Sequence, residues 1–249
     1  MRIAVCVPTH NELKAWFAFD LVMMTGYFCC NPYQDKASLR VIFNSSSILP
    51  SGRQDLVNSA MKFEASHILF LDSDMRFPQE TLHMLLKHDV DIVAANYTTR
   101  KLPLVPVSQD LNRSRIDSRG KTGLQEIYHC GLGVSLIKTE VFKKMEKPYF
   151  MFGYVPETDK WVGEDVYFLH KARALGFKVW IDHDLTLGTK DGKGRPGVSH
   201  IGEYEYDMET LPVWDIGDHR ARAGNGNGAA PGPAIRDVGS GVGLPGNHV

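Results

Sequence analysis

Two aspartates separated by one serine are the first candidates for chemistry in this sequence. Asp72, Ser73 and Asp74 follow an apolar run at 67–71 (HILFL). Carboxylates at the carboxyl end of a buried strand can hold a divalent metal ion, and such an ion can neutralise a diphosphate. Asp-x-Asp also occurs at 89–91 and 182–184, so the tripeptide alone is a weak signal. Position favours the first pair, because only that pair follows a run typical of a central strand.

A second acidic pair and one histidine could belong to the same site. Glu164 and Asp165 follow a glycine and precede a helical pattern. Acidic side chains also favour a helix N-terminus through capping and the helix dipole, so a structural role competes with catalysis. His200 is a candidate metal ligand, although a single histidine is more often an ordinary surface or core residue.

The elements that must position these residues alternate between strand and helix. The predicted strands are short apolar runs at 3–7, 39–43, 67–71, 92–96 and, shorter and edge-like, 178–181. The predicted helices are at 11–26 with Asn11 as the cap, at 54–64, after Pro78, at 139–145 and at 164–175. The segment 147–162 is predicted to be a loop. Repeated strand–helix units predict an α/β fold with a mostly parallel sheet flanked by helices.

Composition sets broad limits on what the chain does. The chain has 249 residues, with 43% hydrophobic and 23% charged residues, as in soluble globular proteins. A net charge of -1 excludes a strongly basic nucleic-acid module. No apolar run reaches the roughly 18 residues that a membrane span needs, and the N-terminus does not resemble a signal peptide. The four cysteines lack metal-binding spacing. We therefore expect a cytoplasmic protein.

The chain is predicted to form one folded domain at 1–220 followed by a flexible tail at 221–249, which is rich in Gly, Pro and Ala. Two further segments carry basic residues. Segment 100–121 has six basic residues against two acidic ones, a net charge of +4 that could face a polyanionic acceptor or simply the solvent. The glycine-rich insertion at 188–197 could fold over a diphosphate as a lid or form an ordinary surface loop.

Six short motifs in order give the chain a family resemblance. They are 5–11 (VCVPTHN), 52–57 (GRQDLV), 68–75 (ILFLDSDM), 131–142 (with Gly131, Gly133, Ile137, Val141 and Phe142), 163–165 (GED) and 200–202 (HIG). In this order the chain resembles the GT-A-fold, family 2-like nucleotide-sugar glycosyltransferases, including small bacterial and phage versions. The resemblance covers about 1–206. It implies a Rossmann-like GT-A fold and transfer of a hexosyl or pentosyl group to an acceptor hydroxyl.

The resemblance also implies roles on the donor side of the site. Pro8, Thr9 and Asn11 match the turn beside the nucleotide base and ribose. Arg53 matches an arginine that approaches the nucleotide, and Ser73 lies among the nucleotide-sugar contacts. Asp72 matches the first acid of the DxD motif, near the ribose or a metal-bound water.

Other matched residues concern the metal and the transfer step. Asp72 and Asp74 are expected to anchor the metal ion, with Asp74 matching the direct ligand. His200 matches a histidine that some relatives add to the metal site. Asp165 matches the general base of inverting members, with Glu164 beside it. The implied cofactor is Mn²⁺ or Mg²⁺, and the implied donor is a UDP- or GDP-sugar. A glycan or a modified phage DNA base is the expected class of acceptor.

The sequence departs from the family pattern near the nucleotide and before the histidine. Gln54 stands where the family often has Asn, and 44–47 (NSSS) replaces an Asp-Asp-Gly-Ser-like base contact. The insertion at 188–197 precedes His200. Two alternatives stay open: a nucleotidyltransferase acting on a sugar phosphate, and a non-catalytic nucleotide-sugar-binding relative. The sequence does not set the donor sugar, the acceptor or the oligomeric state.

Overall fold

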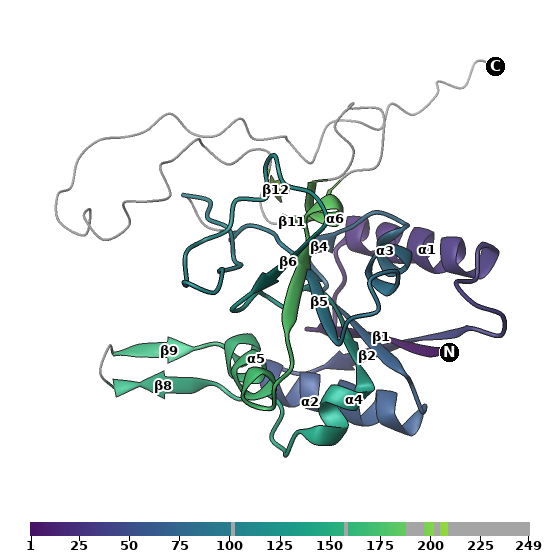
Figure 1. Cartoon of the computed structure of the whole chain (residues 1–249). Coiled ribbons are helices and arrows are strands. Elements are labelled where there is room, and N and C mark those ends of the chain that lie inside the picture. Colours follow the sequence, from purple (N-terminus) through teal and green to yellow (C-terminus); the bar gives the residue numbers. More distant parts are fainter. Residues whose placement is uncertain (101–102, 157–158, 188–196, 202–204, 209–249) are drawn as a thin grey trace, which may run out of the picture.

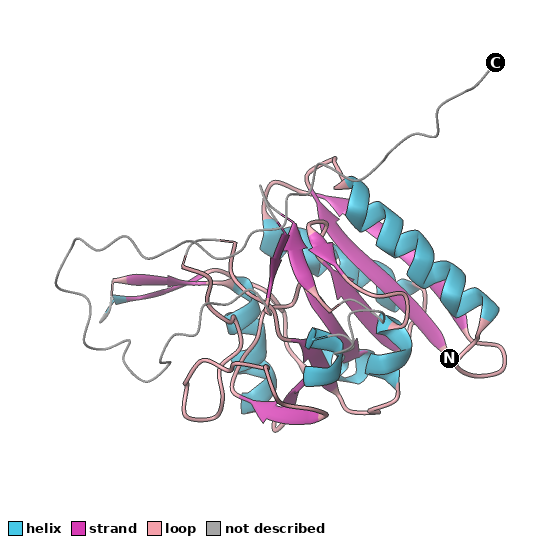
Figure 2. Cartoon of the chain, turned by 90° about the horizontal axis from the view of Figure 1, so that it is seen from above, coloured by secondary structure: helices cyan, strands magenta, loops and turns pink. Residues whose placement is uncertain are grey.

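A mixed seven-stranded sheet with helices on both faces forms the centre of the molecule (Figures 1 and 2). The computed structural model describes residues 1–100, 103–156, 159–187, 197–201 and 205–208. The strands of this sheet are β1 (Arg2–Thr9), β2 (Ser38–Ser45), β3 (His67–Leu71), β5 (Ile92–Ala95), β6 (Leu124–Ile127), β7 (Val134–Lys138) and β10 (Val179–Asp182). The helices are α1 (Ala15–Cys30), α2 (Leu49–Lys62), α3 (Thr81–Leu86), α4 (Thr139–Lys144), α5 (Glu164–Ala174) and α6 (His183–Leu187).

The strand order is β2-β1-β3-β7-β5-β10-β6. Strands β1, β2 and β3 are mutually parallel, and β5 is parallel to β10. Strand β7 runs antiparallel between β3 and β5, and β6 is an antiparallel edge strand beside β10. The predicted α/β fold with a mostly parallel sheet is therefore confirmed. The carboxyl ends of β1, β3, β5 and β10 meet at one edge, where ligands bind in open α/β sheets.

Two smaller sheets accompany the central one. Strands β4 (Met75–Arg76), β11 (Ser199–Ile201) and β12 (Glu205–Asp207) form a three-stranded sheet with β11 in the middle. Strands β8 (Gly153–Val155) and β9 (Lys160–Val162) form a two-stranded hairpin that projects from the body just before α5 (Figure 1).

Apolar side chains fill both faces of the central sheet. Helices α2, α4 and α5 cover one face, where Leu56, Phe142 and Phe168 are buried. Helices α1 and α3 cover the other face with Phe17 and Leu82. Burial on both sides explains why the central strands are nearly continuous apolar runs.

Several boundaries differ from the sequence-based expectations. Asn11 does not cap α1, which begins at Ala15. Instead Asn11 lies in the preceding turn with φ 70° and accepts a hydrogen bond from Ser45. Helix α2 begins at Leu49, five residues earlier than predicted, because Pro50 is tolerated in a first turn. Segment 147–162 contains the β8–β9 hairpin and is not simply a loop.

Two further differences concern the ends of elements. The helix predicted directly after Pro78 begins only at Thr81. Strand β10, predicted to be edge-like, is internal because β6 covers its outer side. The predicted tail at 221–249 lies outside the described residues, as does the insertion at 188–197 apart from Gly197, so both stay predictions. None of the described helices is long and apolar enough to cross a membrane.

Candidate active site

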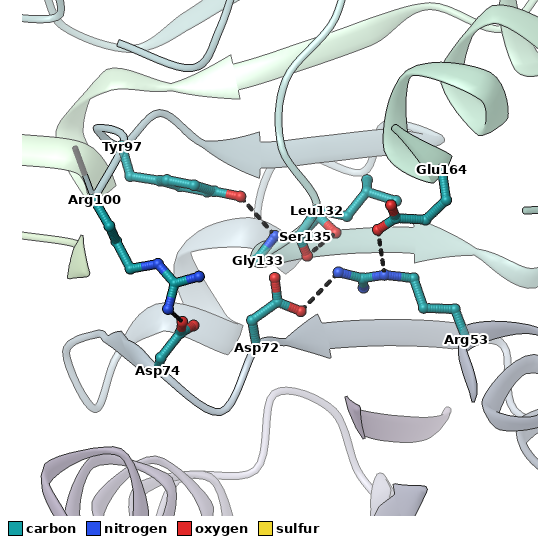
Figure 3. Close-up of polar contacts among 9 residues, drawn as sticks. All are labelled: Arg53, Asp72, Asp74, Tyr97, Arg100, Leu132, Gly133, Ser135 and Glu164. Carbon is teal, nitrogen blue, oxygen red and sulfur yellow. Dashed lines mark hydrogen bonds and ion pairs between the residues drawn. The ribbon is translucent and has the colours of Figure 1, made fainter. Parts of the chain in front are cut away.

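A buried arginine lies at the centre of the candidate site (Figure 3). The Arg53 side chain, 2% exposed, comes from α2. Its Nη2 donates to Oδ1 of Asp72 at 2.7 Å, and its Nε donates to Oε1 of Glu164 at 3.2 Å. The guanidinium also lies over the ring of Phe70, 5.2 Å from the centroid. One cation therefore joins the acid after β3 to the acid that begins α5.

Asp72 and Glu164 stabilise the charged form of Arg53. Burial alone would lower the pKa of Arg53, but Asp72 and Glu164 reverse that effect and raise it. Nη1 of Arg53 is buried and has no hydrogen-bond partner among the described residues. A buried guanidinium group with a free N–H is an unsatisfied donor, which an anionic or carbonyl oxygen could satisfy.

The turn after β3 is fixed against the loop before β7. The backbone N–H of Asp72 donates to the carbonyl of Gly133 at 2.9 Å, and the N–H of Gly133 donates to Oη of Tyr97 at 2.9 Å. A Cβ at position 131 would lie 2.0 Å from that hydroxyl, and a Cβ at position 133 would lie 2.8 Å from it. The close approach of Tyr97 therefore requires glycine at both positions of Gly131-Leu132-Gly133.

Asp74 is paired with an arginine from the loop after β5. Nη1 of Arg100 lies 2.5 Å from Oδ2 of Asp74, and Figure 3 shows the two side chains pointing toward each other. The Arg100 side chain is 55% exposed, whereas that of Asp74 is 20% exposed. The carbonyl of Asp74 accepts a hydrogen bond from the N–H of Ile201 at 2.7 Å, which ties the turn to β11.

His200 lies beside this pair on β11. It stands opposite Met75 in the register of β11 and β4, its Nδ1 is 2.5 Å from the carbonyl of Thr98, and its ring contacts Tyr97 edge-on. The carbonyl can only accept, so Nδ1 carries the proton and Nε2 keeps its lone pair. The pKa of His200 lies below its usual value, because the effect of burial outweighs the opposing effect of the nearby Asp74. A neutral imidazole oriented by a backbone carbonyl is the usual state of a metal-binding histidine.

The side chains at this edge suit a divalent cation whose remaining ligands come from the substrate. Within the described ranges, no three His, Cys, Asp or Glu side chains gather into a ready-made metal site. Carboxylate oxygen from Asp74 and imidazole nitrogen from His200 are nevertheless ligands that Mn²⁺ accepts. Mg²⁺ and Mn²⁺ in nucleotide sites commonly take their other ligands from phosphate and water. The residues present therefore fit such an ion, provided that Arg100 releases Asp74.

The acidic pair at the start of α5 is divided between two environments. Glu164 is buried against Arg53, while Asp165 accepts a hydrogen bond from the N–H of Val166 at 2.7 Å. Burial, with Glu164 adding repulsion, raises the pKa of Asp165 to about 6. A Cβ at Gly163 would lie 2.7 Å from Oδ1 of Asp165, so glycine leaves room for this carboxylate. Asp165 is therefore mostly ionised at neutral pH yet basic enough to accept a proton.

The residues predicted for nucleotide binding lie where β1 and β2 end. Pro8 and Thr9 are paired with Asn44 and Ser45 in the parallel register, and the side chain of Ser45 donates to that of Asn11. Oδ1 of Asn44 is buried and lacks a partner among the described residues. Ser73 lies half-buried between the two aspartates. These polar groups share the sheet edge with Arg53 and Asp72.

The sequence did not single out Tyr97 or assign Arg100 to the site. Tyr97 follows β5, and the pKa of its hydroxyl lies well above the usual value because of burial and the charge of Asp72. The available signal for Tyr97 was indirect: the spaced glycines at 131 and 133 imply that a bulky group approaches the backbone there. Arg100 belonged only to the basic segment 100–121.

Comparisons with known proteins show the fold. No family model matches the chain, and no curated protein matches it. The solved structure of A197 from STIV has a TM-score of 0.52 and 14% identity, and the match covers 84% of this chain and 91% of that chain. The structure of GalNAc-T7 with UDP, GalNAc and Mn²⁺ has a TM-score of 0.51 and 13% identity, and the match covers 80% of this chain but only 43% of that chain. The predicted GT-A-type fold is thereby confirmed.

Proposed function

We propose that this protein is a metal-dependent glycosyltransferase that moves a sugar from a nucleoside-diphosphate sugar to an acceptor hydroxyl. The observation that carries the proposal is the double contact of Arg53 with Asp72 and Glu164. It brings the Asp72–Asp74 turn and the Glu164–Asp165 pair to one sheet edge in a GT-A-type fold. The similar structure of GalNAc-T7, which contains UDP, GalNAc and Mn²⁺, supports the same assignment.

The donor would bind along the ends of β1, β2 and β3. In this proposal Pro8, Thr9 and Asn11 face the base and ribose, and Ser73 contacts the nucleotide sugar. Asn44, opposite Pro8 in the register of β1 and β2, lies at the same strand ends. The donor is a UDP- or GDP-sugar carrying a hexosyl or pentosyl group.

Asp74 and His200 are the proposed metal-binding residues, with Asp72 beside them. A bound Mn²⁺ or Mg²⁺ would supply positive charge that stabilises the diphosphate as it leaves. Arg53 holds Asp72 in a fixed orientation, so that the carboxylate needs no rearrangement when the donor arrives. The carbonyl of Thr98 orients the imidazole of His200 in the same way.

Asp165 is the proposed general base. Its carboxylate accepts the proton of the acceptor hydroxyl as the hydroxyl oxygen attacks the anomeric carbon, and attack from the face opposite the diphosphate inverts that carbon. A base whose pKa is near the working pH contributes about 10²–10⁴-fold to the rate. Glu164, paired with Arg53, fixes the N-terminus of α5 and so positions Asp165. The acceptor is a glycan or a modified DNA base.

The test is a thermal-shift screen of nucleotide sugars, followed by an assay of sugar transfer. A donor should raise the melting temperature of the protein only in the presence of Mn²⁺ or Mg²⁺, because a ligand stabilises the state that binds it. Asp74→Ala should lose this metal-dependent shift while remaining folded, and Asp165→Asn should keep the shift but lose transfer. Full transfer by Asp74→Ala would refute the proposal.

The same screen separates the alternative functions. Release of pyrophosphate from a nucleoside triphosphate and a sugar phosphate would identify a nucleotidyltransferase. Metal-dependent donor binding without hydrolysis or transfer, across a broad acceptor panel, would identify a non-catalytic relative.

A further inference from the structure

The structure divides the arginines of segment 100–121 into paired and unpaired groups. Arg100 pairs with an aspartate of the candidate active site, and Arg119 pairs with the aspartate two residues before it. Arg113 and Arg115 differ, because no carboxylate in the described part of the chain forms an ion pair with either. Arg113 and Arg115 therefore carry two positive charges of this segment that no described carboxylate balances.

A third unpaired arginine joins them at Tyr128. The guanidinium of Arg113 lies 4.6 Å from the centroid of the Tyr128 ring, and its Nη2 donates to the ring hydroxyl at 3.0 Å. Arg173, from the last turn of α5, lies 5.3 Å from the same centroid and donates to the carbonyl of Ile127. Among the described residues Arg173 has no carboxylate partner either. Two cations from distant parts of the chain therefore contact one ring.

Arg115 lies in the same neighbourhood, because Gln109 forms antiparallel bridges with both Arg115 and His129. It is half-buried, and burial lowers its pKa. Its Nη1 donates to two backbone carbonyls, those of Pro106 and Val107. These two hydrogen bonds satisfy Nη1, but carbonyl groups do not neutralise the positive charge of the guanidinium. The other N–H groups of Arg115 have no acceptor within the described ranges.

The charges of Arg113 and Arg115 both act on His129. Burial, followed by the charges of Arg115 and Arg113, lowers the pKa of His129 to about 4, so it is neutral at pH 7. Its Nδ1 is buried without a hydrogen-bond partner among the residues that the structure describes. In the described part of the chain, no acidic side chain offsets the two arginines at this position.

We propose that Arg113, Arg115 and Arg173 form a binding site for a phosphate group. Cations held close together repel one another, and an anion would remove that repulsion. The planar guanidinium matches phosphate oxygens in a bidentate geometry, and a phosphate monoester carries nearly two negative charges. These three arginines are not among the residues of the proposed donor site around Arg53. The interpretation that this phosphate belongs to the acceptor substrate rests on the proposed function, whereas the binding of phosphate itself does not.

The test measures binding to a fluorescent single-stranded oligonucleotide at about 50 mM salt, where phosphate interactions are least screened. Arg113→Ala should weaken binding about tenfold, because it removes a charged hydrogen-bond donor. The slope of log Kd against log salt should fall by about 0.7 for each phosphate that the variant no longer neutralises. Arg119→Ala is the matched control, since that arginine lies in the same segment but is already paired. It should change binding less than twofold.

Competition identifies the source of the phosphate. Displacement of the probe by millimolar inorganic phosphate indicates a site for a single phosphate or monoester, and undisplaced, Arg113-dependent binding indicates a phosphodiester polymer. Absence of oligonucleotide binding, or equal weakening by Arg113→Ala and Arg119→Ala, overturns the proposal. Arg113 is exposed, so Arg113→Ala should keep the wild-type melting temperature, and weaker binding by this variant then reports the lost side chain and not unfolding. Neither readout needs turnover, so failure of the glycosyltransferase proposal would be seen separately.

Discussion

Nε of Arg53 and Oε1 of Glu164 lie 3.2 Å apart in the protein interior, although 111 positions separate the two residues in the chain. The pair joins α2 to the N-terminus of α5 and therefore fixes the acidic pair at 164–165 relative to the turn after β3. A buried ion pair contributes little net stability once desolvation is counted, but it specifies one arrangement of the groups that it joins. Here the arrangement is that of the candidate active site.

Removing the Arg53 side chain should destabilise the protein strongly. Arg53→Ala leaves Glu164 buried without its counter-charge, so we expect a decrease of about 3 kcal/mol in the free energy of unfolding. Urea denaturation measures this. Arg2→Ala is the control, because Arg2 forms an exposed pair with Glu64 and should cost less than about 1 kcal/mol. Equal effects of the two substitutions would contradict the central role of Arg53.

Asp165 should set the acidic side of the pH profile. With the pKa of Asp165 raised to about 6, kcat/KM for transfer should fall as the pH drops below about 6, because the base becomes protonated. Asp165→Asn should lower transfer by about 10²–10⁴-fold. A profile that stays flat between pH 7 and pH 5 would argue against Asp165 as the base.

The raised pKa of Asp165 also predicts that the stability of the protein rises as the pH falls, whereas its activity decreases. An acid whose pKa is raised on folding stabilises the fold while it is protonated. That contribution is complete below the unfolded value of about 3.8 and disappears as the pH rises through about 6. Asp165→Asn should therefore be more stable than the wild type at pH 7.5, by about 1–2 kcal/mol, and the difference should vanish below about pH 4. Thermal melts across this pH range measure it, and a constant difference would exclude the shifted pKa as its cause.

The sequence predicted the elements that are buried on both sides. Strands β1 and β3 are continuous apolar runs, and such runs mark central strands directly. The hairpin β8–β9 was missed because its side chains face the solvent more than the core and so lack the pattern that burial imposes. The start of α1 was misplaced because Asn11, a good capping residue, is held in the preceding turn by Ser45 on another strand.

The candidate site was predictable only in part. The acids at 72, 74, 164 and 165 stood out through their position after strand or glycine signals, and Arg53 through the family resemblance. The interactions of Arg53 with Glu164 and of Arg100 with Asp74 join residues distant in the chain, and neither propensity nor periodicity carries such information. Tyr97 was equally hidden, since a buried tyrosine after a strand looks like any core residue until the facing glycines are placed.

Arg100 should compete with the metal for Asp74. Its guanidinium occupies the carboxylate that the proposed metal site needs, and its side chain is exposed enough to move away. Arg100→Met should therefore bind Mn²⁺ about fivefold more tightly in the absence of nucleotide, the effect expected for removing one partly exposed ion pair. Electron paramagnetic resonance of free Mn²⁺ measures this without turnover. Arg2→Ala should leave the affinity unchanged, and an unchanged affinity in Arg100→Met would remove Arg100 from the metal site.

The packing of Tyr97 against Gly131 should be sensitive to a single methyl group. A Cβ at position 131 would lie 2.0 Å from Oη of Tyr97 and 2.7 Å from its Cζ, so Gly131→Ala must displace a buried ring that packs against His200. We expect a decrease of about 1–3 kcal/mol in the free energy of unfolding, the usual cost of overpacking a core.

Gly26→Ala is the matched control for this substitution. Gly26 lies within α1 and a Cβ there meets nothing within 4 Å, so alanine should stabilise the protein by about 0.5–1 kcal/mol through its higher helix propensity. Urea denaturation of both variants should therefore give changes of opposite sign. Combining Gly131→Ala with Tyr97→Ala should cost less than the sum of the two single substitutions, because the truncated side chain makes room for the methyl group. Strict additivity would show that Tyr97 is not what requires glycine at position 131.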